Sequence, residues 1–315
     1  MPTMSGHVLV TGASGFIGAC LVRRLVNAGR SVHVVLRSST PPARLAGIGR
    51  HITAHQADLR DADAVRRVVA ACKPDVIYHL AAYGTHPDQR DRSAILANNV
   101  LGTANLLDAV EDLDYAAFVH AGSSSEYGRV DRPMREDDVL RPRSDYGVAK
   151  AAATLLCQSE AARGRPVVTV RVFSAYGPHE SPDRLASSVM TACLRGETPR
   201  VTRGEQPRDW IYVDDVLDLL ERAAIQPRVE GAVLHAGSGR NQTVRDMVEA
   251  IVSLCPIGHR HPYYGAVPAR PDEPTVWVAD IARTTKLTGW SPRIELAEGV
   301  RTMWDWFTSW YRQAA

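Results

Sequence analysis

The sequence predicts an α/β protein with a doubly wound parallel sheet and a smaller α+β C-terminal lobe. In the first half of the 315-residue chain, short apolar runs alternate with stretches of helical periodicity. This alternation is typical of βαβ units with right-handed crossovers. After Phe173 the alternation stops, and prolines and glycines divide the chain into shorter pieces, which indicates a second lobe packed on the first.

The predicted elements follow from these two patterns. Apolar runs predict strands at His7–Thr11, Ser31–Leu36, His51–Gln56, Asp75–His79, Ala116–His120 and Val167–Val172. Apolar residues at helical spacing predict long helices at Ile95–Val110 and Ser144–Ala162, and further helices at Val216–Ala224, Val244–Leu254 and Leu296–Trp310.

Composition excludes several classes of protein. Lys+Arg number 37 and Asp+Glu 35, and this near balance argues against a dedicated nucleic-acid binder. No apolar run approaches the ~18 residues of a membrane helix. The five cysteines are widely spaced without a CxxC pair, and His259–His261 lack a third ligand in pattern, so we expect neither disulfides nor a metal site. Met1–His7 is too short and polar for a signal peptide, which favours the cytoplasm.

A glycine-rich turn joins the first predicted strand to the first helix. Thr11–Gly18 reads TGASGFIG, with glycines at 12, 15 and 18 and Phe16 and Ile17 between the last two. Gly12 permits the tight turn, Gly15 lets a pyrophosphate approach, and Gly18 lets helix and strand pack closely. The alternative is a tight turn without a ligand. We therefore expect a Rossmann-type dinucleotide-binding domain over residues 1–173, joined by 208–236, with 174–207 and 237–315 forming the substrate-binding lobe.

The GxxGxxG spacing resembles that of the extended short-chain dehydrogenases/reductases, a family of NAD(P)-dependent nucleotide-sugar epimerases, dehydratases and ketoreductases, and the resemblance extends over essentially the whole chain. It implies cofactor contacts after the third, fourth and sixth strands and on the helix between them. The residues at these positions are Asp58, Leu59, Leu80, Ala81, Ala82, Asn99 and Phe173.

The end of the second strand bears on the choice of cofactor. An NAD enzyme typically carries an acid there for the ribose 2′-hydroxyl, whereas this chain reads Leu36-Arg37-Ser38. Arg37 and Ser38 would instead clamp a 2′-phosphate, so the sequence favours NADP(H) and leaves NAD(H) as the alternative. Arg37 as a mere surface cation beside the adenine also stays open.

Tyr146 and Lys150 form a YxxxK motif. Residues four apart share one helix face, and a nearby cation would lower the pKa of the phenol. The resemblance implies that this lysine also binds the nicotinamide ribose, and that Ser123, four residues before Tyr127, polarises the substrate carbonyl. A solvated helix and a serine-rich capping turn are the plain alternatives. Lysine is scarce, with only Lys73, Lys150 and Lys286 in the chain, so Lys150 stands out.

Further positions resemble the family's nucleotide-sugar site. Thr85, Ser124, Ser125 and Ser174 would line the sugar, Arg208 and Arg270 would reach the diphosphate, and Glu273 the ribose. Ser124-Ser125 replace the Asp-Glu pair of 4,6-dehydratases, and Glu126 is expected to point elsewhere, so dehydration is disfavoured.

Together these residues predict an NADP(H)-dependent nucleotide-sugar oxidoreductase, in the first place a 4-ketoreductase of an NDP-4-keto-(6-deoxy)hexose. The alternatives are a 4-epimerase that retains its cofactor, a 4,6-dehydratase, and a non-catalytic NADP-binding protein. By resemblance, we expect a homodimer that pairs through Ile95–Val110 and Ser144–Ala162.

Overall fold

The computed structural model describes residues 6–38, 43–86, 88–226, 229–255, 261–269 and 275–314. Its centre is a seven-stranded sheet in the order β11-β6-β5-β4-β1-β2-β3, in which every neighbouring pair is parallel. The strands are β1 (His7–Thr11), β2 (Ser31–Leu36), β3 (Ile52–Gln56), β4 (Val76–His79), β5 (Ala117–Ser123), β6 (Val167–Val172) and β11 (Val233–Ala236). The predicted fold class is confirmed.

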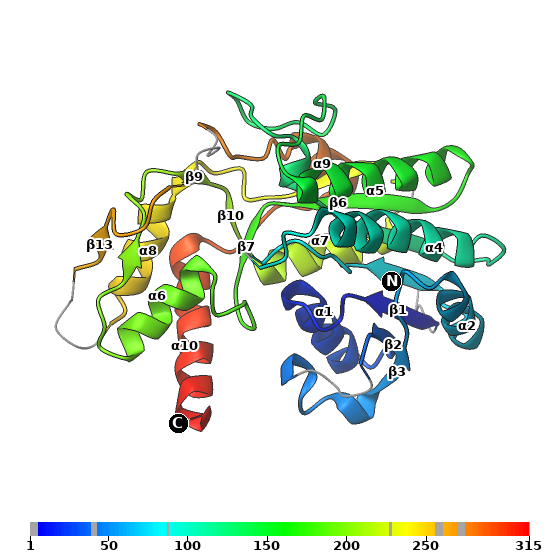
Figure 1. The fold of residues 1–315 in the computed structure, drawn as a ribbon, viewed down its shortest axis with the longest axis horizontal. Coiled ribbons are helices and arrows are strands. Elements are labelled where there is room, and N and C mark those ends of the chain that lie inside the picture. The colour runs from blue at the N-terminus through cyan, green and yellow to red at the C-terminus, as the bar shows by residue number, and fades with distance from the viewer. Residues whose placement is uncertain are drawn as a thin grey trace.

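Helices cover both faces of the sheet (Figure 1). The buried cores that lie between the helices and the two faces are separate clusters of mostly aliphatic residues. One face is covered by α1 (Phe16–Asn27) and α7 (Val213–Ile225), and the other by α2 (Ala62–Cys72), α4 (Gly102–Ala109) and α5 (Asp145–Ala162). Valine-rich strands buried on both sides are typical of a parallel sheet.

Strand β5 runs three residues beyond its predicted end. Ala121, Gly122 and Ser123 pair with the last residues of β6, from Val170 to Val172. Small residues carry little strand propensity, so the sequence pattern missed them, and the pairing with β6 supplies the missing preference. The extension brings Ser123 to the edge of the sheet as the last residue of the strand.

The predicted helix Ile95–Val110 is not a continuous α-helix. It consists of α3 (Arg92–Leu96), a π-helical turn η3 (Ala97–Leu101) and α4. The π turn contains Asn99, and the Thr103 hydroxyl donates to the Asn99 carbonyl oxygen (2.6 Å). Turns of this kind are frequent at functional sites, and hydrophobic periodicity does not reveal them.

The second lobe is built from short elements (Figure 1, left). Its helices α6 (Leu185–Leu194), α8 (Val244–Val252) and α10 (Leu296–Ala314) lie on that side of Figure 1, whereas α9 (Ala282–Thr288) contacts β11 of the central sheet. Its strands form three two-stranded sheets: β7 (Ser174–Tyr176) with β10 (Trp210–Tyr212), β9 (Pro207–Arg208) with β12 (Gln242–Thr243), and β8 (Arg200–Val201) with β13 (Tyr263–Tyr264). Single turns of 3-10 helix are η1 (Ala43–Leu45), η2 (Gly49–His51) and η4 (Ser124–Glu126).

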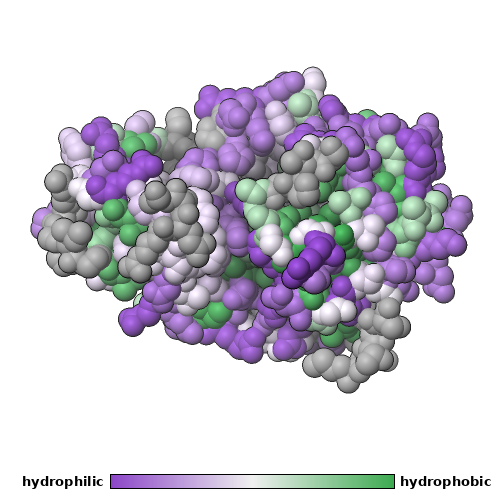
Figure 2. All heavy atoms as spheres, turned by 90° about the horizontal axis from the view of Figure 1, so that it is seen from below, coloured by the Kyte–Doolittle hydropathy of each residue, from purple (hydrophilic) through white to green (hydrophobic). Residues whose placement is uncertain are grey.

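Seen from below, the surface is mostly hydrophilic, and apolar residues show in separate patches (Figure 2). Over the described ranges, no helix has the length and apolar character needed to span a membrane. The five cysteines are free thiols, three of them buried.

Candidate active site

The carboxyl ends of the central strands bring the predicted site residues to one edge of the sheet. β1 leads into the glycine turn, β4 into Leu80–Ala82, β5 ends on Ser123, and β6 is followed by Phe173. β1 and β4 are neighbours, and the strand order reverses between them. In open α/β sheets, ligands bind at the carboxyl ends of the strands at such a reversal.

The glycine turn has the shape of a phosphate cradle. Gly12 has φ +71°, and a Cβ there would lie 2.5 Å from the backbone nitrogen of Ala81. A Cβ at Gly18 would collide with the Gly12 carbonyl oxygen. Gly15 is exposed, and it begins α1 without a side-chain cap, so the first amides of the helix face the site. Phe16 and Ile17 pack half-buried on the core. These residues fit a dinucleotide pyrophosphate.

A directional chain of hydrogen bonds fixes the neighbouring loop. The Thr103 hydroxyl donates to the Asn99 carbonyl, so its oxygen accepts from Nε2 of His79 (2.9 Å). Nδ1 of His79 then accepts from the Thr11 hydroxyl (2.7 Å). The Thr11 oxygen in turn accepts from the backbone of Ala81 (3.3 Å). Burial lowers the pKa of His79 to about 3, so the ring is neutral as this chain requires. The chain couples the end of β4 to the π turn.

The other predicted cofactor residues lie along the same edge, several with partners of their own. The Asn99 amide bonds both the backbone nitrogen (2.7 Å) and the carbonyl (2.8 Å) of Tyr83. Asp58 accepts from Arg60, which lowers the pKa of its carboxyl, and the Arg37 charge acts in the same direction. Arg37 and Ser38 are exposed at the end of β2. The Leu59 carbonyl, Leu80, Ala81, Ala82 and Phe173 lie on the loops after their strands.

Tyr146 and Lys150 lie one turn apart on α5, and the Ser123 side chain lies near Tyr146. Burial raises the pKa of Tyr146, while the Ser123 hydroxyl and the Arg184 guanidinium lower it. The direction is opposite to the one expected from Lys150, because loss of solvation is the largest influence and outweighs the Arg184 charge. The expectation of a lowered phenol pKa is therefore wrong.

Lys150 is almost fully buried, at 2% exposure. Its ammonium nitrogen lies 3.4 Å from Nε2 of His120 on β5. Burial lowers the pKa of Lys150 to about 8, and the Glu126 carboxylate opposes this. His120 is held neutral, since burial and the Lys150 charge lower its pKa well below the ordinary value. Sequence reasoning missed His120, because a histidine in a strand carries no motif.

Ser123 takes both of the parts that the sequence left open. Its hydroxyl accepts from the backbone of Ser125 (3.2 Å) and caps the turn η4, as in the capping-turn alternative. The same hydroxyl lies close enough to Tyr146 to lower the pKa of the phenol, as the catalytic interpretation requires. Glu126 completes the capping box by accepting from the Ser123 backbone nitrogen (2.7 Å), and it is fully buried.

The predicted substrate residues are only partly brought together. Ser124 and Ser125 follow Ser123 in η4, Ser174 begins β7, and exposed Thr85 follows Gly84. The carbonyl of Thr85 accepts from Arg184 (3.5 Å), a cation at the start of α6 that sequence reasoning missed. Arg208 lies half-buried on β9, beside the second lobe's short strands. Arg270, Glu273 and most of His259–His261 lie outside the described residues. Within the described ranges, no three His, Cys, Asp or Glu side chains form a metal-binding group.

Comparison with known proteins identifies the family. A model of the NAD dependent epimerase/dehydratase family matches residues 8–237. The chain belongs to this family. The predicted resemblance and the expectation of an enzyme of the short-chain dehydrogenase/reductase type are both confirmed.

Three relatives match this chain over nearly its whole length. The dTDP-glucose 4,6-dehydratase of Streptomyces griseus is 30% identical, over 98% of this chain and 97% of its own. The UDP-glucose 4-epimerase of Thermotoga maritima, solved with UDP-glucose, superimposes with a TM-score of 0.87 at 25% identity, over 97% of this chain and 99% of its own. MoeE5, solved with UDP-glucuronic acid and NAD, superimposes with a TM-score of 0.82 at 34% identity, over 98% and 100%.

Proposed function

We propose that this epimerase/dehydratase family member is an NAD(P)-dependent nucleotide-sugar 4-epimerase. The proposal rests on two features of the site. Ser123, Tyr146 and Lys150 lie near one another, and the turn η4 after Ser123 offers no acidic side chain to the sugar. The family's 4-epimerases and ketoreductases need only these three residues at the sugar, whereas a dehydratase also needs a side chain that moves the C5 proton.

The state of Glu126 argues against dehydration. It is the only acid within η4, and it is fully buried, bonded to the Ser123 backbone (2.7 Å) and to Arg171 (2.7 Å). Ser124 and Ser125, the residues nearer to Ser123, carry no titratable group at neutral pH. No carboxylate of this turn is therefore free to exchange a proton with the sugar.

The mechanism assigns one task to each residue. A bound nicotinamide supplies hydride acceptance and return at C4 of the sugar. The Tyr146 phenolate would take the proton of the C4 hydroxyl as hydride leaves C4, and return it to the same oxygen when hydride comes back to the opposite face of C4; the Ser123 hydroxyl would donate to that oxygen. Lys150 holds a positive charge beside the nicotinamide ribose, which favours the phenolate form of Tyr146.

We further propose that the sugar is presented as a nucleoside diphosphate, in line with UDP-glucose and UDP-glucuronic acid in the relatives. Arg208 would bind the diphosphate, and the sequence resemblance assigns Arg270 to the diphosphate and Glu273 to the ribose. Arg184 favours a sugar that carries a carboxylate. It places a positive charge beside the Thr85 carbonyl and close enough to Tyr146 to lower the pKa of its phenol.

The test is product analysis by proton NMR with UDP-glucose, UDP-glucuronic acid and dTDP-glucose. A 4-epimerase yields the C4 epimer of one of them without a lasting absorbance change at about 340 nm, since the hydride returns. A 4-keto-6-deoxy product would identify a dehydratase and overturn the proposal.

Arg37 favours a second candidate, the NADPH-dependent 4-ketoreductase that the sequence placed first. The exposed guanidinium at the end of β2 suits a 2′-phosphate, and no acid occupies this position. The relatives described above are named for dehydration, epimerisation or bound NAD, which favours the epimerase. Stoichiometric NADPH oxidation by a 4-keto sugar nucleotide, with no epimerisation, would support the reductase.

We also propose that the protein is a homodimer paired through α3, η3, α4 and α5. These helices pack against one another, and four of their large apolar side chains are exposed to solvent. The exposed residues are Leu96, Leu101, Val148 and Leu155, at 39%, 48%, 46% and 57%. Apolar side chains gathered on one face of this kind mark interfaces.

A further inference from the structure

A buried ion pair lies directly behind Ser123. The Glu126 carboxylate accepts from Nε of Arg171 on β6 (2.7 Å), and the two side chains are 0% and 3% exposed. Buried charges of this kind persist only when they are paired and hydrogen-bonded. Proton transfer to the sugar does not explain why this pair is present, because the buried Glu126 carboxylate cannot reach the sugar.

Both oxygens of Glu126 and two of the three guanidinium nitrogens of Arg171 are hydrogen-bonded. Glu126 uses Oε2 for Arg171 and Oε1 for the Ser123 backbone nitrogen (2.7 Å). Nη1 of Arg171 donates to the Tyr127 hydroxyl (2.5 Å) and to the Glu136 carbonyl (3.2 Å), and its guanidinium stacks over the Tyr127 ring at 4.6 Å. The carboxylate thus cannot move without breaking contacts to β5 and β6, and its partner Arg171 is held in turn by Tyr127 and by the loop at Glu136.

The backbone leaves room for this carboxylate and for little else. Gly122 pairs with Arg171 across β5 and β6, and a Cβ at residue 122 would lie 2.8 Å from Oε1 of Glu126. The Ser123 backbone is therefore held by Glu126, while its hydroxyl accepts from the Ser125 backbone and lies near Tyr146.

We propose that Glu126 is the positioning residue of Ser123. Its carboxylate, held by Arg171, fixes the Ser123 backbone at the end of β5 and so sets the direction of the hydroxyl toward Tyr146 and the reacting sugar oxygen. The inference rests on the proposed function, because that function gives Ser123 its contact with the substrate. Glu126 itself touches no substrate.

The test is a double-mutant cycle between Glu126→Gln and Ser123→Ala, using whichever of UDP-glucose, UDP-glucuronic acid and dTDP-glucose the wild type turns over fastest. Glu126→Gln lowers kcat by about 100-fold with KM nearly unchanged, since a small misplacement of a catalytic group costs rate and not binding. In the Ser123→Ala background the same change costs nothing further. An equal loss in both backgrounds would overturn the proposal.

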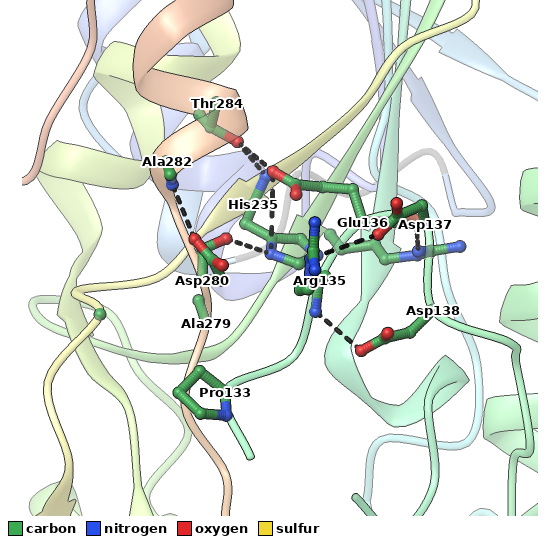
Figure 3. A network of polar contacts seen from close by, with 12 residues as sticks. Pro133, Arg135, Glu136, Asp137, Asp138, His235, Ala279, Asp280, Ala282 and Thr284 are labelled. Carbon is green, nitrogen blue, oxygen red and sulfur yellow. Dashed lines mark hydrogen bonds and ion pairs between the residues drawn. The ribbon is translucent and has the colours of Figure 1, made fainter.

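Glu136→Gln is the matched control. Glu136 is also a buried carboxylate, bonded to Thr284 (3.0 Å) in the network of Figure 3, but its side chain does not touch Ser123. It is expected to lower the melting temperature while kcat stays within about twofold. A comparable kcat loss in Glu136→Gln would reduce the role of Glu126 to general stability and contradict the proposal.

Two arms keep the result decisive if a variant folds poorly. Glu126→Gln/Arg171→Gln leaves no uncompensated buried charge, and the same kcat loss is expected of it. A crystal structure of either variant shows Ser123 displaced, and an unmoved Ser123 would refute the positioning role without any substrate. Should Ser123→Ala keep full activity, the proposed function fails instead, and the crystallographic arm still tests Glu126.

Discussion

The ammonium nitrogen of Lys150 lies 3.4 Å from Nε2 of His120, and both side chains are buried. Nδ1 of His120 has no hydrogen-bond partner among the described residues. The neutral ring thus offers its Nε2 lone pair to Lys150 and leaves a proton on the unpartnered Nδ1, a buried cost that this one contact offsets. The site fits a compact ammonium, not a planar guanidinium with five N–H donors.

Lys150→Arg is expected to lower kcat by about 100-fold or more, because the fork cannot occupy the ammonium site without displacing His120 or Tyr146. Lys73→Arg and Lys286→Arg are matched controls: both lysines are exposed, one at the end of α2 and one on α9. We expect each control to stay within about twofold of wild type. Steady-state kinetics on the three variants check this, and equal losses in all three would contradict it.

Arg37→Asp is expected to reverse the cofactor preference. A guanidinium bound to the 2′-phosphate contributes a charge-assisted hydrogen bond, so the variant should lose about 10-fold to 100-fold in NADPH affinity and gain affinity for NADH. Fluorescence titration of both reduced cofactors measures the change. Arg66→Asp, on the exposed face of α2, is the control. If wild type binds NADH as tightly as NADPH, Arg37 is only a surface cation.

Leu155→Glu is expected to break the dimer. Leu155 is 57% exposed on α5, and a charge buried there at a homodimer interface has no partner. Light scattering should give twice 34.4 kDa for wild type and the monomer mass for the variant. Val139→Glu, at an exposed position away from these helices, should stay dimeric. A monomeric wild type would refute the pairing.

His235 is expected to make folding sensitive to acid. It is fully buried, with Nε2 on the Tyr127 hydroxyl (2.5 Å) and Nδ1 on the Asp280 carbonyl (3.0 Å; Figure 3). Burial lowers its pKa to about 4. The unfolded chain takes up a proton near pH 6.5 and the folded chain does not, so the stabilisation is present above pH 6.5 and lost as pH falls toward 4.

Denaturant unfolding of wild type and His235→Gln measures this effect. The stability advantage of wild type should shrink by about 2 kcal/mol between pH 7 and pH 5, because glutamine does not titrate. Other titrating groups are common to both proteins and cancel in the difference. A difference that stays constant with pH would show that His235 takes up its proton equally in the folded and unfolded states, and would contradict the lowered pKa.

The sequence predicted the architecture well because the strands are continuous valine-rich runs and the glycine turn follows the first of them directly. It missed features that depend on contacts across the chain. β5 reaches Ser123 only by pairing with β6, and the helix around Asn99 contains a π turn that periodicity cannot distinguish. The domain boundaries stay a prediction.

At the site, motifs with fixed spacing were predictable, whereas the partners that hold them were not. Tyr146 and Lys150 share a helix face by spacing alone. The contacts of Glu126 with Arg171 and of Lys150 with His120 join positions 45 and 30 residues apart, which no local pattern reveals. The direction of the Tyr146 pKa was wrong for the same reason, since burial is a property of the fold.

The most direct test of the 4-epimerase assignment follows the hydrogen at C4. In one experiment, the enzyme is incubated in D₂O with unlabelled UDP-glucose or UDP-glucuronic acid. In a matched experiment in H₂O, the same substrate carries deuterium at C4. The products of both are examined by NMR. We predict the C4 epimer with its C4 label retained and no solvent deuterium at C5, and no product from Tyr146→Phe. Solvent deuterium at C5 of a 4-keto-6-deoxy product, or epimerisation undiminished in Tyr146→Phe, would contradict the account.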